Sequence, residues 1–292
     1  MFSIDNTSLT YFEVLKRASS FLEENKRPSF AAEWLLRERL DWSKTELVTK
    51  FHQKISDKER EQFIQDINSF VEGYPMQQII GHDWFYDRKF LVNEHTLIPR
   101  PETEEWLDQV LAVLPRRPLK VLDIGTGSGV LAITEKLERP DDLVVATDIS
   151  KEALKMAQKN AQLLGAEVTF KEGNLFEPVA DEQFDLILCN PPYISVDEVD
   201  LMDQSVLEHE PDLALFAKEQ GLFIYYELAK KIKNHLTADA FIFLEIGYLQ
   251  AKKVMEIFKK ALPTATVESW RDFNQNDRVI AIYVNNGDKS CG

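Results

Sequence analysis

Apolar residues recur every three or four positions through the first 75 residues, as at Phe63, Ile67 and Phe70, which is the spacing of one helix face. Three segments begin with the capping-box pattern, in which a hydroxyl residue precedes a glutamate by three positions: Thr10 with Glu13, Ser43 with Glu46, and Ser56 with Glu59. Residues 1–75 are therefore predicted to form a small helical bundle.

Residues 76–98 have a different pattern. Gly73 and Pro75 end the last predicted helix of the bundle. Two short apolar runs follow, at residues 84–86 and 90–92, separated by the polar residues 87–89. Two runs of that length around a polar turn predict a β-hairpin. We expect the segment 76–98 to be a hairpin linker between the bundle and the rest of the chain.

From about residue 119, apolar runs of strand length alternate with helical stretches such as residues 150–164. Alternation of this kind is typical of an α/β domain whose mostly parallel sheet is covered by helices on both faces. Two strands near the end leave no room for a helix between them, so we expect them to be antiparallel. The domain is predicted over residues 99–287, followed by a tail at 288–292. The apolar runs cover residues 120–124, 143–148, 167–170, 184–189 and 240–246, and the last two strands cover 266–268 and 279–284.

The charge balance indicates the class of partner. The chain of 292 residues has 34 Lys and Arg against 49 Asp and Glu, a formal net charge of −15. A protein that binds nucleic acid usually carries a basic surface that neutralises phosphates. We therefore expect no direct binding to nucleic acid and a neutral or basic protein partner instead.

Cysteine, histidine and targeting patterns narrow the class further. Two cysteines far apart in the sequence give no disulfide framework, and the five histidines lack metal-ligand spacing, so we expect no metal. The first residues contain neither the basic region nor the apolar core of a secretory signal. No apolar run is long enough to span a bilayer. The expectation is a cytoplasmic protein without membrane association.

Candidate chemistry begins where the first predicted strand meets a helix. Residues 125–129 read Gly-Thr-Gly-Ser-Gly, and glycines at such a turn let the backbone approach a ligand closely. Asp148 ends the next strand, where its carboxylate can accept hydrogen bonds from ribose hydroxyls. The plainer alternatives are a tight turn at the glycines and a helix cap at Asp148, although Ser150 is also available as that cap. Together, the loop and the acid indicate a nucleoside cofactor.

The tetrad Asn190-Pro191-Pro192-Tyr193 directly follows the fourth strand of this domain. Two consecutive prolines stiffen the loop and remove two amide donors, so the loop presents carbonyl oxygens. Together with the side-chain oxygen of Asn190, these can accept both hydrogens of an incoming –NH2 group. Tyr193 offers an aromatic wall for a flat amide or base. The structural alternative is a turn that only ends the strand.

These elements, in this order, resemble class I N-methyltransferases, and the wider pattern is similar to one family. Residues 97–104 read Leu-Ile-Pro-Arg-Pro-Glu-Thr-Glu, residues 210–215 hold a Glu-Pro-x-x-Ala-Leu pattern, and residues 244–247 read Leu-Glu-Ile-Gly. With the loop at Asn190, they resemble the release factor glutamine methyltransferase family, also called HemK or PrmC. The resemblance covers about residues 77–284 and the helical region before them.

The resemblance implies a fold, a cofactor and a reaction. The fold is the Rossmann-like α/β fold of class I methyltransferases, with a mostly parallel seven-stranded sheet and a small N-terminal helical bundle. The reaction is that of a protein-(glutamine-N5) methyltransferase: S-adenosylmethionine gives a methyl group to the glutamine of the Gly-Gly-Gln motif in class I peptide chain release factors, and S-adenosylhomocysteine is the product. The helical bundle would recognise the release factor, and we expect a monomer.

The expected site residues fall into three groups. Catalysis is assigned to Asn190, Pro191, Pro192 and Tyr193. Cofactor binding is assigned to Gly125, Thr126, Gly127, Ser128, Gly129, Asp148, Asn174, Leu175 and Asn190. Substrate binding is assigned to Asn190, Tyr193, Arg100 and Phe85.

Some of these assignments have alternatives. Arg100 can instead form an ion pair with Glu102 or Glu104, and Phe85 can be a core aromatic. Residues 174 and 175 are Asn-Leu where the family frequently has Asp followed by an aromatic residue, near the expected adenine pocket.

Two other functions compete with this reading. An adenine-N6 nucleic-acid methyltransferase shares the Asn190 loop, but it should carry a basic groove and a means of extruding its target base. A non-catalytic protein that senses the cofactor is the third possibility. Sensing alone does not need a loop that grips an amide, so the intact tetrad disfavours it.

Overall fold

The chain folds into two compact units. The computed structural model describes residues 1–4 and 8–284, with only the backbone of residues 200 and 201. One unit holds residues 1–82 together with 203–209, and the other holds residues 83–202 and the chain from 210 onward. The predicted tail at 288–292 lies outside the described residues.

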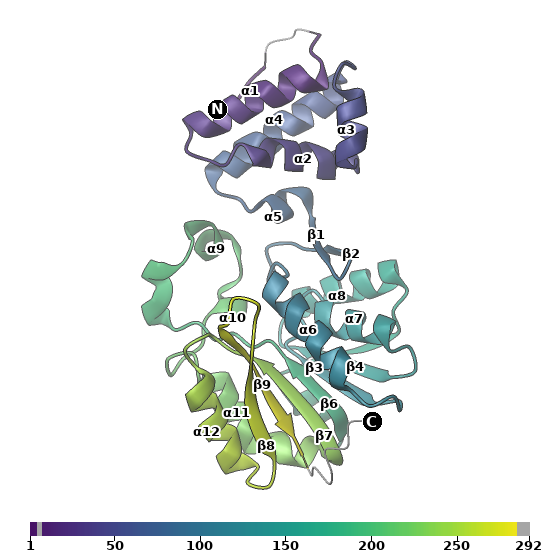
Figure 1. Ribbon diagram of the computed structural model, residues 1–292, viewed down its shortest axis with the longest axis vertical. Helices are drawn as coiled ribbons and strands as arrows, with labels where there is room; N and C mark the ends of the chain where they lie inside the picture. The colour runs from purple at the N-terminus through teal and green to yellow at the C-terminus, as the bar shows by residue number, and fades with distance from the viewer. Residues whose placement is uncertain (5–7, 285–292) are drawn as a thin grey trace. The chain divides into compact units, whose positions relative to one another are not determined.

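The smaller unit is a helical bundle (Figure 1). Its core includes Leu22, Leu35, Phe63 and Ile67, all with 0% exposure. All three predicted capping boxes are present, at the starts of α1, α3 and α4, and Gly73 ends α4 with a left-handed φ of 110°. The capping residues and the apolar spacing thus predict the same helices. The helices are α1 (Tyr11–Glu24), α2 (Phe30–Leu40), α3 (Lys44–Lys50), α4 (Asp57–Glu72), α5 (Met76–Ile80) and α9 (Gln204–His209).

One segment of this unit comes from far along the chain. Residues 203–209, which include α9, cluster with the bundle and not with their sequence neighbours. The ring of His209 stacks on Tyr74 with centroids 4.1 Å apart, and Gln78 Nε2 donates to the His209 carbonyl oxygen at 2.7 Å. The bundle is therefore completed by a second stretch of chain, which the sequence pattern did not predict.

The larger unit contains the predicted sheet. Its described strands form a seven-stranded sheet in the order β5-β4-β3-β6-β7-β9-β8. The first five of these are parallel, and β9 runs antiparallel to both β7 and β8. The α/β class, the parallel sheet and the antiparallel final pair are confirmed. The strands are β3 (Lys120–Ile124), β4 (Leu143–Asp148), β5 (Val168–Glu172), β6 (Phe184–Cys189), β7 (Leu236–Glu245), β8 (Thr266–Arg271) and β9 (Asp277–Tyr283).

Helices and short connections complete the chain around this sheet. Two short strands, β1 and β2, pair with each other. Their bounds are β1 (His82–Phe85) and β2 (Arg88–Leu91). The remaining elements are α6 (Pro101–Val113), α7 (Val130–Glu138), α8 (Lys151–Leu164), η1 (Glu177–Val179), η2 (Val196–Leu201), α10 (Asp212–Leu215), α11 (Phe223–Lys231), η3 (Ile232–His235) and α12 (Ala251–Ala261).

Both faces of the sheet are covered, because successive side chains of a strand point to opposite sides. One core joins the sheet to α6 and α7 and includes Val121, Leu186, Phe243 and Val279. The other joins it to α11 and α12 and includes Leu122, Ile187, Ile242 and Ile280. Figure 1 shows the two sets of helices on opposite sides of the strands. With both faces filled, a ligand has access to this unit mainly at the sheet edges.

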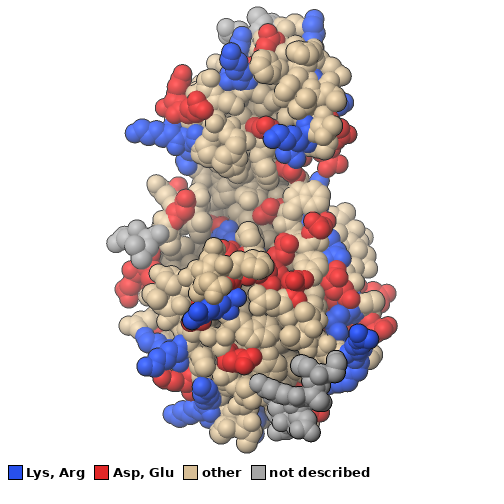
Figure 2. All heavy atoms as spheres, viewed as in Figure 1, with Lys and Arg blue, Asp and Glu red and all other residues tan. Residues whose placement is uncertain are grey.

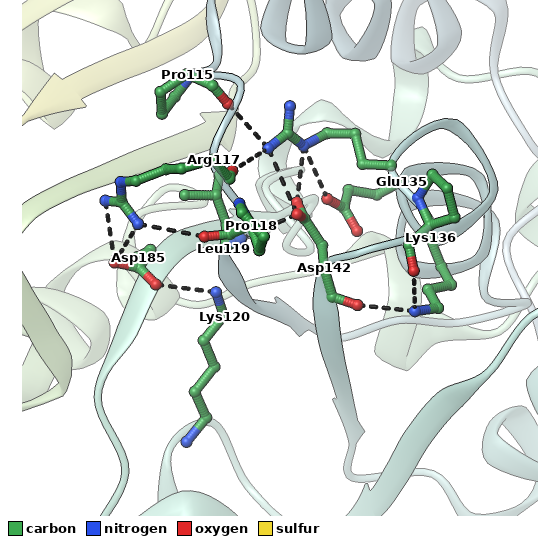
Figure 3. Close-up of polar contacts among 11 residues, drawn as sticks. Pro115, Arg117, Pro118, Leu119, Lys120, Glu135, Lys136, Asp142 and Asp185 are labelled. Carbon is green, nitrogen blue, oxygen red and sulfur yellow. Dashed lines mark hydrogen bonds and ion pairs between the residues drawn. The ribbon is translucent and has the colours of Figure 1, made fainter.

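A polar cluster lies where β3 and β4 begin, and Figure 3 labels Pro115, Arg117 and Asp142 among its members. The Arg139 guanidinium donates to the carbonyl oxygens of Pro115 and Arg117, both at 2.9 Å, and to the Asp142 carboxylate at 2.7 Å. Asp142 has 0% exposure and also accepts from the backbone N–H of Leu119 at 2.9 Å. These contacts tie the starts of β3 and β4 together.

Candidate active site

A pocket of about 430 Å³ lies at the carboxyl edge of the sheet. The chain enters the sheet at β3, builds outward through β4 and β5, and then returns to place β6 on the other side of β3. Ligands of open α/β sheets bind at such a reversal. The lining residues that directly follow strands are Gly125–Ser128 after β3, Ile149 and Ser150 after β4, Gly173–Leu175 after β5, and Asn190–Pro192 after β6.

The glycine-rich loop after β3 is tied to the end of β4. The N–H groups of Gly125 and Thr126 donate to the Thr147 carbonyl oxygen at 2.8 and 3.0 Å, and Gly127 N–H donates to Asp148 Oδ2 at 2.9 Å. A Cβ at Gly125 or Gly127 would meet nothing within 4 Å. Both glycines therefore leave room for a ligand against the backbone.

Gly129 has a different reason to be glycine. It is not among the residues that line the pocket. A Cβ there would lie 2.7 Å from Ile133 Cδ1 and 3.2 Å from the Ala157 Cβ, which belong to α7 and α8. The structure thus places this predicted cofactor residue at a helix contact instead.

Asp148 is a prepared acceptor at the pocket wall. Its side chain accepts from Gly127 and from the backbone N–H of Ser150, the latter at 2.8 Å, and it is 9% exposed. Burial raises the pKa of this carboxyl, and the backbone hydrogen bonds counteract that rise. Ser150 caps α8 by accepting from Ala153, so Asp148 is not the helix cap. A carboxylate here fits the ribose of the predicted nucleoside.

A second carboxyl lies beneath the glycine loop. Asp123 is fully buried, and its Oδ2 accepts from Thr126 Oγ1 at 2.6 Å and from the Ala132 N–H at 3.2 Å. Burial raises the pKa of Asp123 to about 7. The sequence pattern alone predicts no role for this residue. It supports the loop from below and is not among the pocket-lining side chains.

The rest of the cofactor side of the pocket is largely apolar. Ile149, Leu175, Phe223 and Ile224 line it, and Asn174 adds a polar edge. Leu175 has a φ of +50°, a conformation that non-glycine residues rarely adopt and that often occurs at ligand sites. Apolar walls with a few polar groups are typical of a pocket for a flat heterocycle such as adenine. The residues present therefore fit a nucleoside cofactor.

The loop after β6 brings three of its four predicted residues to the same pocket. Asn190, Pro191 and Pro192 line it. The fourth, Tyr193, does not: its hydroxyl donates to Glu245 Oε1 at 3.2 Å, and burial raises its pKa well above the usual range. The aromatic wall expected from Tyr193 is therefore not formed in this structure, because its phenol is held inside the protein.

The two remaining substrate candidates separate. Arg100 lines the pocket and pairs with Glu210 at 2.6 Å, not with the glutamates at 102 or 104. Glu210 is buried and also accepts from the Ile98 N–H at 3.2 Å. The ion pair between Arg100 and Glu210 therefore holds the chain in place at one side of the pocket. Phe85 is only 1% exposed and packs edge-to-face on Phe90 with centroids 6.0 Å apart. Phe85 is thus a core aromatic and lies outside the pocket lining.

The sequence pattern did not single out some residues that line the pocket or support its walls. Thr103, Glu210 and Glu245 lie within the matched motifs, but those motifs gave them no individual role. A buried carboxylate needs hydrogen-bond partners. Acidic residues inside apolar motifs could therefore have indicated buried hydrogen-bond networks near the site. The apolar wall residues Leu213 and Phe223 gave none, because apolar side chains in short helices normally read as core.

The described part of the chain contains neither a metal-binding cluster nor a membrane-spanning helix. Among residues 1–4 and 8–284, no three His, Cys, Asp or Glu side chains gather in a way that could hold a metal ion. Within the same residues, every helix is too short or too polar to cross a membrane.

Comparison with known proteins gives the same picture over both units. Residues 13–81 match the PrmC N-terminal domain model, and residues 107–211 match the methyltransferase small domain model. A solved structure of a methyltransferase from Pyrococcus furiosus is similar at a TM-score of 0.52, covering 78% of this chain and 98% of its own. Its identity is 15%, so this similarity concerns the fold alone.

Curated relatives are similar along nearly their whole length. The release factor glutamine methyltransferase of Enterococcus faecalis is 44% identical over 269 residues, which is 92% of this chain and 97% of the relative. The one from Bacillus subtilis is 40% identical over 282 residues, covering 94% and 98%. The resemblance inferred from the motifs is confirmed, and the chain belongs to the release factor glutamine methyltransferase family.

Proposed function

We propose that this enzyme transfers a methyl group from S-adenosylmethionine to the side-chain amide nitrogen of the glutamine in the Gly-Gly-Gln motif of class I peptide chain release factors, leaving S-adenosylhomocysteine. One observation carries the proposal: Asp148 and Asn190 border the same cavity, at the ends of β4 and β6. One can hold a nucleoside, and the other can hold an amide. The relatives, which are release factor glutamine methyltransferases, support the choice of a glutamine amide.

On one side of the pocket, side chains and backbone groups described above would bind the cofactor. Asp148 would accept from the ribose, the glycine loop would leave space for the rest of the cofactor, and Leu175 with Phe223 would enclose the adenine. Asn174 would supply a polar contact at its edge. When bound, S-adenosylmethionine supplies a methyl group activated by its positively charged sulfur.

The amide side must make a poor nucleophile reactive. The lone pair of an amide nitrogen is delocalised into its carbonyl, so position and local electrostatics decide the rate. Asn190 Oδ1 and the Pro191 carbonyl oxygen would accept the two amide hydrogens, which favours pyramidal nitrogen and stabilises the positive charge that develops on it. Each such contact can contribute about 3 kcal/mol. Holding the reacting atoms in line can contribute about 7–11 kcal/mol.

After transfer, the nitrogen carries an extra proton that has become acidic. Water can accept it, so a strong general base is not needed. Arg100 borders the pocket and is held by Glu210, and we propose that it lies along the path of the substrate loop. Residues 1–75 would provide a second surface for the release factor.

The partner is proposed to be a protein and not a nucleic acid. The net charge of −15 opposes binding to a polyanion. Figure 2 shows Lys and Arg side chains separated by acidic and uncharged ones on the face drawn, whereas a nucleic-acid groove needs a continuous basic surface. We further propose that the enzyme acts as a monomer in the cytoplasm.

Methyl transfer from radiolabelled S-adenosylmethionine to a purified class I release factor tests the function. A parallel reaction uses the release factor with its Gly-Gly-Gln glutamine changed to alanine. We expect label in the first protein only, at a single glutamine located by peptide mass spectrometry. Equal labelling of both proteins, or labelling of an adenine-containing oligonucleotide instead, would overturn the proposal.

A further inference from the structure

A chain of hydrogen bonds runs from the core of the larger unit to Asn190 at the pocket. Trp106 Nε1 donates to Glu245 Oε2 at 2.7 Å, and Thr103 Oγ1 donates to the same oxygen at 2.6 Å. Asn190 Nδ2 then donates to Thr103 Oγ1 at 3.2 Å. The three supporting side chains are at most 2% exposed, so water does not compete for the two bonds to Glu245.

The donors in this chain can point in one direction only. An indole N–H donates and never accepts, so Glu245 Oε2 must be an acceptor. A threonine hydroxyl has one hydrogen, and Thr103 uses it on that short contact to the carboxylate. The hydroxyl oxygen of Thr103 can then only accept from Asn190, and only the amide nitrogen can donate to it. The side-chain oxygen of Asn190 is therefore turned toward the pocket.

Burying Glu245 is costly without such partners. Burial raises the pKa of this carboxyl, and the bonds from Thr103 and Trp106 work against that rise. Its second oxygen accepts from the Tyr193 hydroxyl. The carboxylate therefore contacts Tyr193, the last residue of the loop, directly, and it is linked to Asn190, the first residue, through Thr103.

The far end of the loop is fixed as well. Gln250 Nε2 donates to the Tyr193 carbonyl oxygen at 2.9 Å. Gly221 packs against the same group, since a Cβ there would lie 2.0 Å from that oxygen. These contacts hold the loop backbone at Tyr193. They do not determine whether the oxygen or the nitrogen of the Asn190 side-chain amide faces the pocket.

We propose that Thr103 and Glu245 are positioning residues, which hold the amide of Asn190 with its oxygen toward the substrate amide. Glu245 does not border the pocket. Thr103 does, but its hydroxyl is engaged by Glu245 and Asn190, so we infer that both residues act through Asn190. A flipped Asn190 would present its own –NH2 to the –NH2 of the substrate, donor against donor. This inference rests on the proposed role of Asn190.

Thr103→Val removes the hydroxyl while keeping the shape of the side chain. We expect kcat to fall about 10- to 100-fold, as for other residues that orient a reacting group, with the cofactor Kd nearly unchanged. Thr103→Ser, which restores the hydroxyl, should recover most of the rate. The control is Thr264→Val, an exposed threonine just before β8 at the opposite edge of the sheet, which should behave as wild type.

A double-mutant cycle separates positioning from general damage. In an Asn190→Ala background, Thr103→Val should cause no further loss of kcat, because the group that it orients is already gone. Glu245→Ala should show the same pattern. Losses that multiply in the double variant would contradict the proposal, since they would mean that Thr103 acts independently of Asn190.

A readout without turnover keeps this test apart from that of the function. The side-chain NH2 signals of Asn190 in an amide nitrogen-15 NMR spectrum are assigned by their absence in Asn190→Ala. In the wild type, one of these hydrogens should exchange slowly with solvent, and Thr103→Val should make it exchange faster. Unchanged exchange in Thr103→Val would overturn the positioning role even if glutamine methylation is confirmed. The expected change would support it even if the substrate proved to be another amide.

Discussion

Asn190→Ala tests the chemistry most directly. It removes one of the two oxygens assigned to the substrate amide and leaves the carbonyl of Pro191 in place. Loss of one preorganised contact of this kind costs about 3 kcal/mol in the transition state, which is about 100-fold in kcat. The fold should lose only about 1 kcal/mol, because Asn190 gives up a single hydrogen bond and Thr103 keeps its bond to Glu245.

Single-turnover transfer of labelled methyl to a release factor measures the chemical step, and titration calorimetry measures the cofactor Kd. We expect a slow chemical step with a Kd close to that of the wild type. Asn174→Ala is the matched comparison, because Asn174 lines the cofactor side of the same pocket and should raise the Kd with a smaller effect on the chemical step. An Asn190→Ala enzyme with a rate within about threefold of wild type would refute the assigned role.

Three further predictions concern cofactor binding and stability. Asp148→Asn removes the charge that strengthens ribose hydrogen bonds, so the cofactor Kd should rise about tenfold by calorimetry; an unchanged Kd would place the ribose elsewhere. Arg139→Ala leaves the buried Asp142 without its cation and should lower the free energy of unfolding in urea by about 3–5 kcal/mol. The control Arg116→Ala, at an exposed position, should lower it by less than about 0.5 kcal/mol, and equal losses would contradict this account. Because burial raises the pKa of Asp123 to about 7, the folded protein keeps a proton that the unfolded chain releases, and stability should fall as pH rises from about 4 to about 7. Asp123→Asn should remove about 3 kcal/mol of the difference in unfolding free energy between pH 5 and pH 8, and an unchanged pH dependence would mean that Asp123 is ionised throughout.

Much of the fold could be predicted because local signals and the final packing agree. All five predicted parallel strands are present, and three of them, β3, β5 and β6, are followed directly by glycine or asparagine. The capping boxes placed three helix starts correctly, since each depends on residues only three positions apart. Residues 203–209 were not placed, because their partners Tyr74 and Gln78 lie more than a hundred positions earlier.

The pocket was predictable where it consists of residues that follow strands. Parallel strands bring their carboxyl ends to one edge, so Gly127, Asp148 and Asn190 could be expected to meet. Side-chain direction could not be predicted in the same way. Tyr193 and Phe85 are aromatic residues near the site in sequence, but one is held by Glu245 and the other packs on Phe90. Which side of a loop an aromatic ring takes depends on long-range partners that no local pattern records.

The return of residues 203–209 to the helical bundle has a consequence for dissecting the enzyme. The chain passes between the two units three times, after residues 82, 202 and 209, so a single protease cut at the first crossing should leave two fragments that remain associated and co-elute. A recombinant fragment ending at residue 82 would lack the strip that covers Tyr74 and Gln78 and should be less stable than the same bundle in the intact enzyme. Supplying residues 203–209 as a peptide, or joining them to the fragment through a glycine linker, should restore that lost stability.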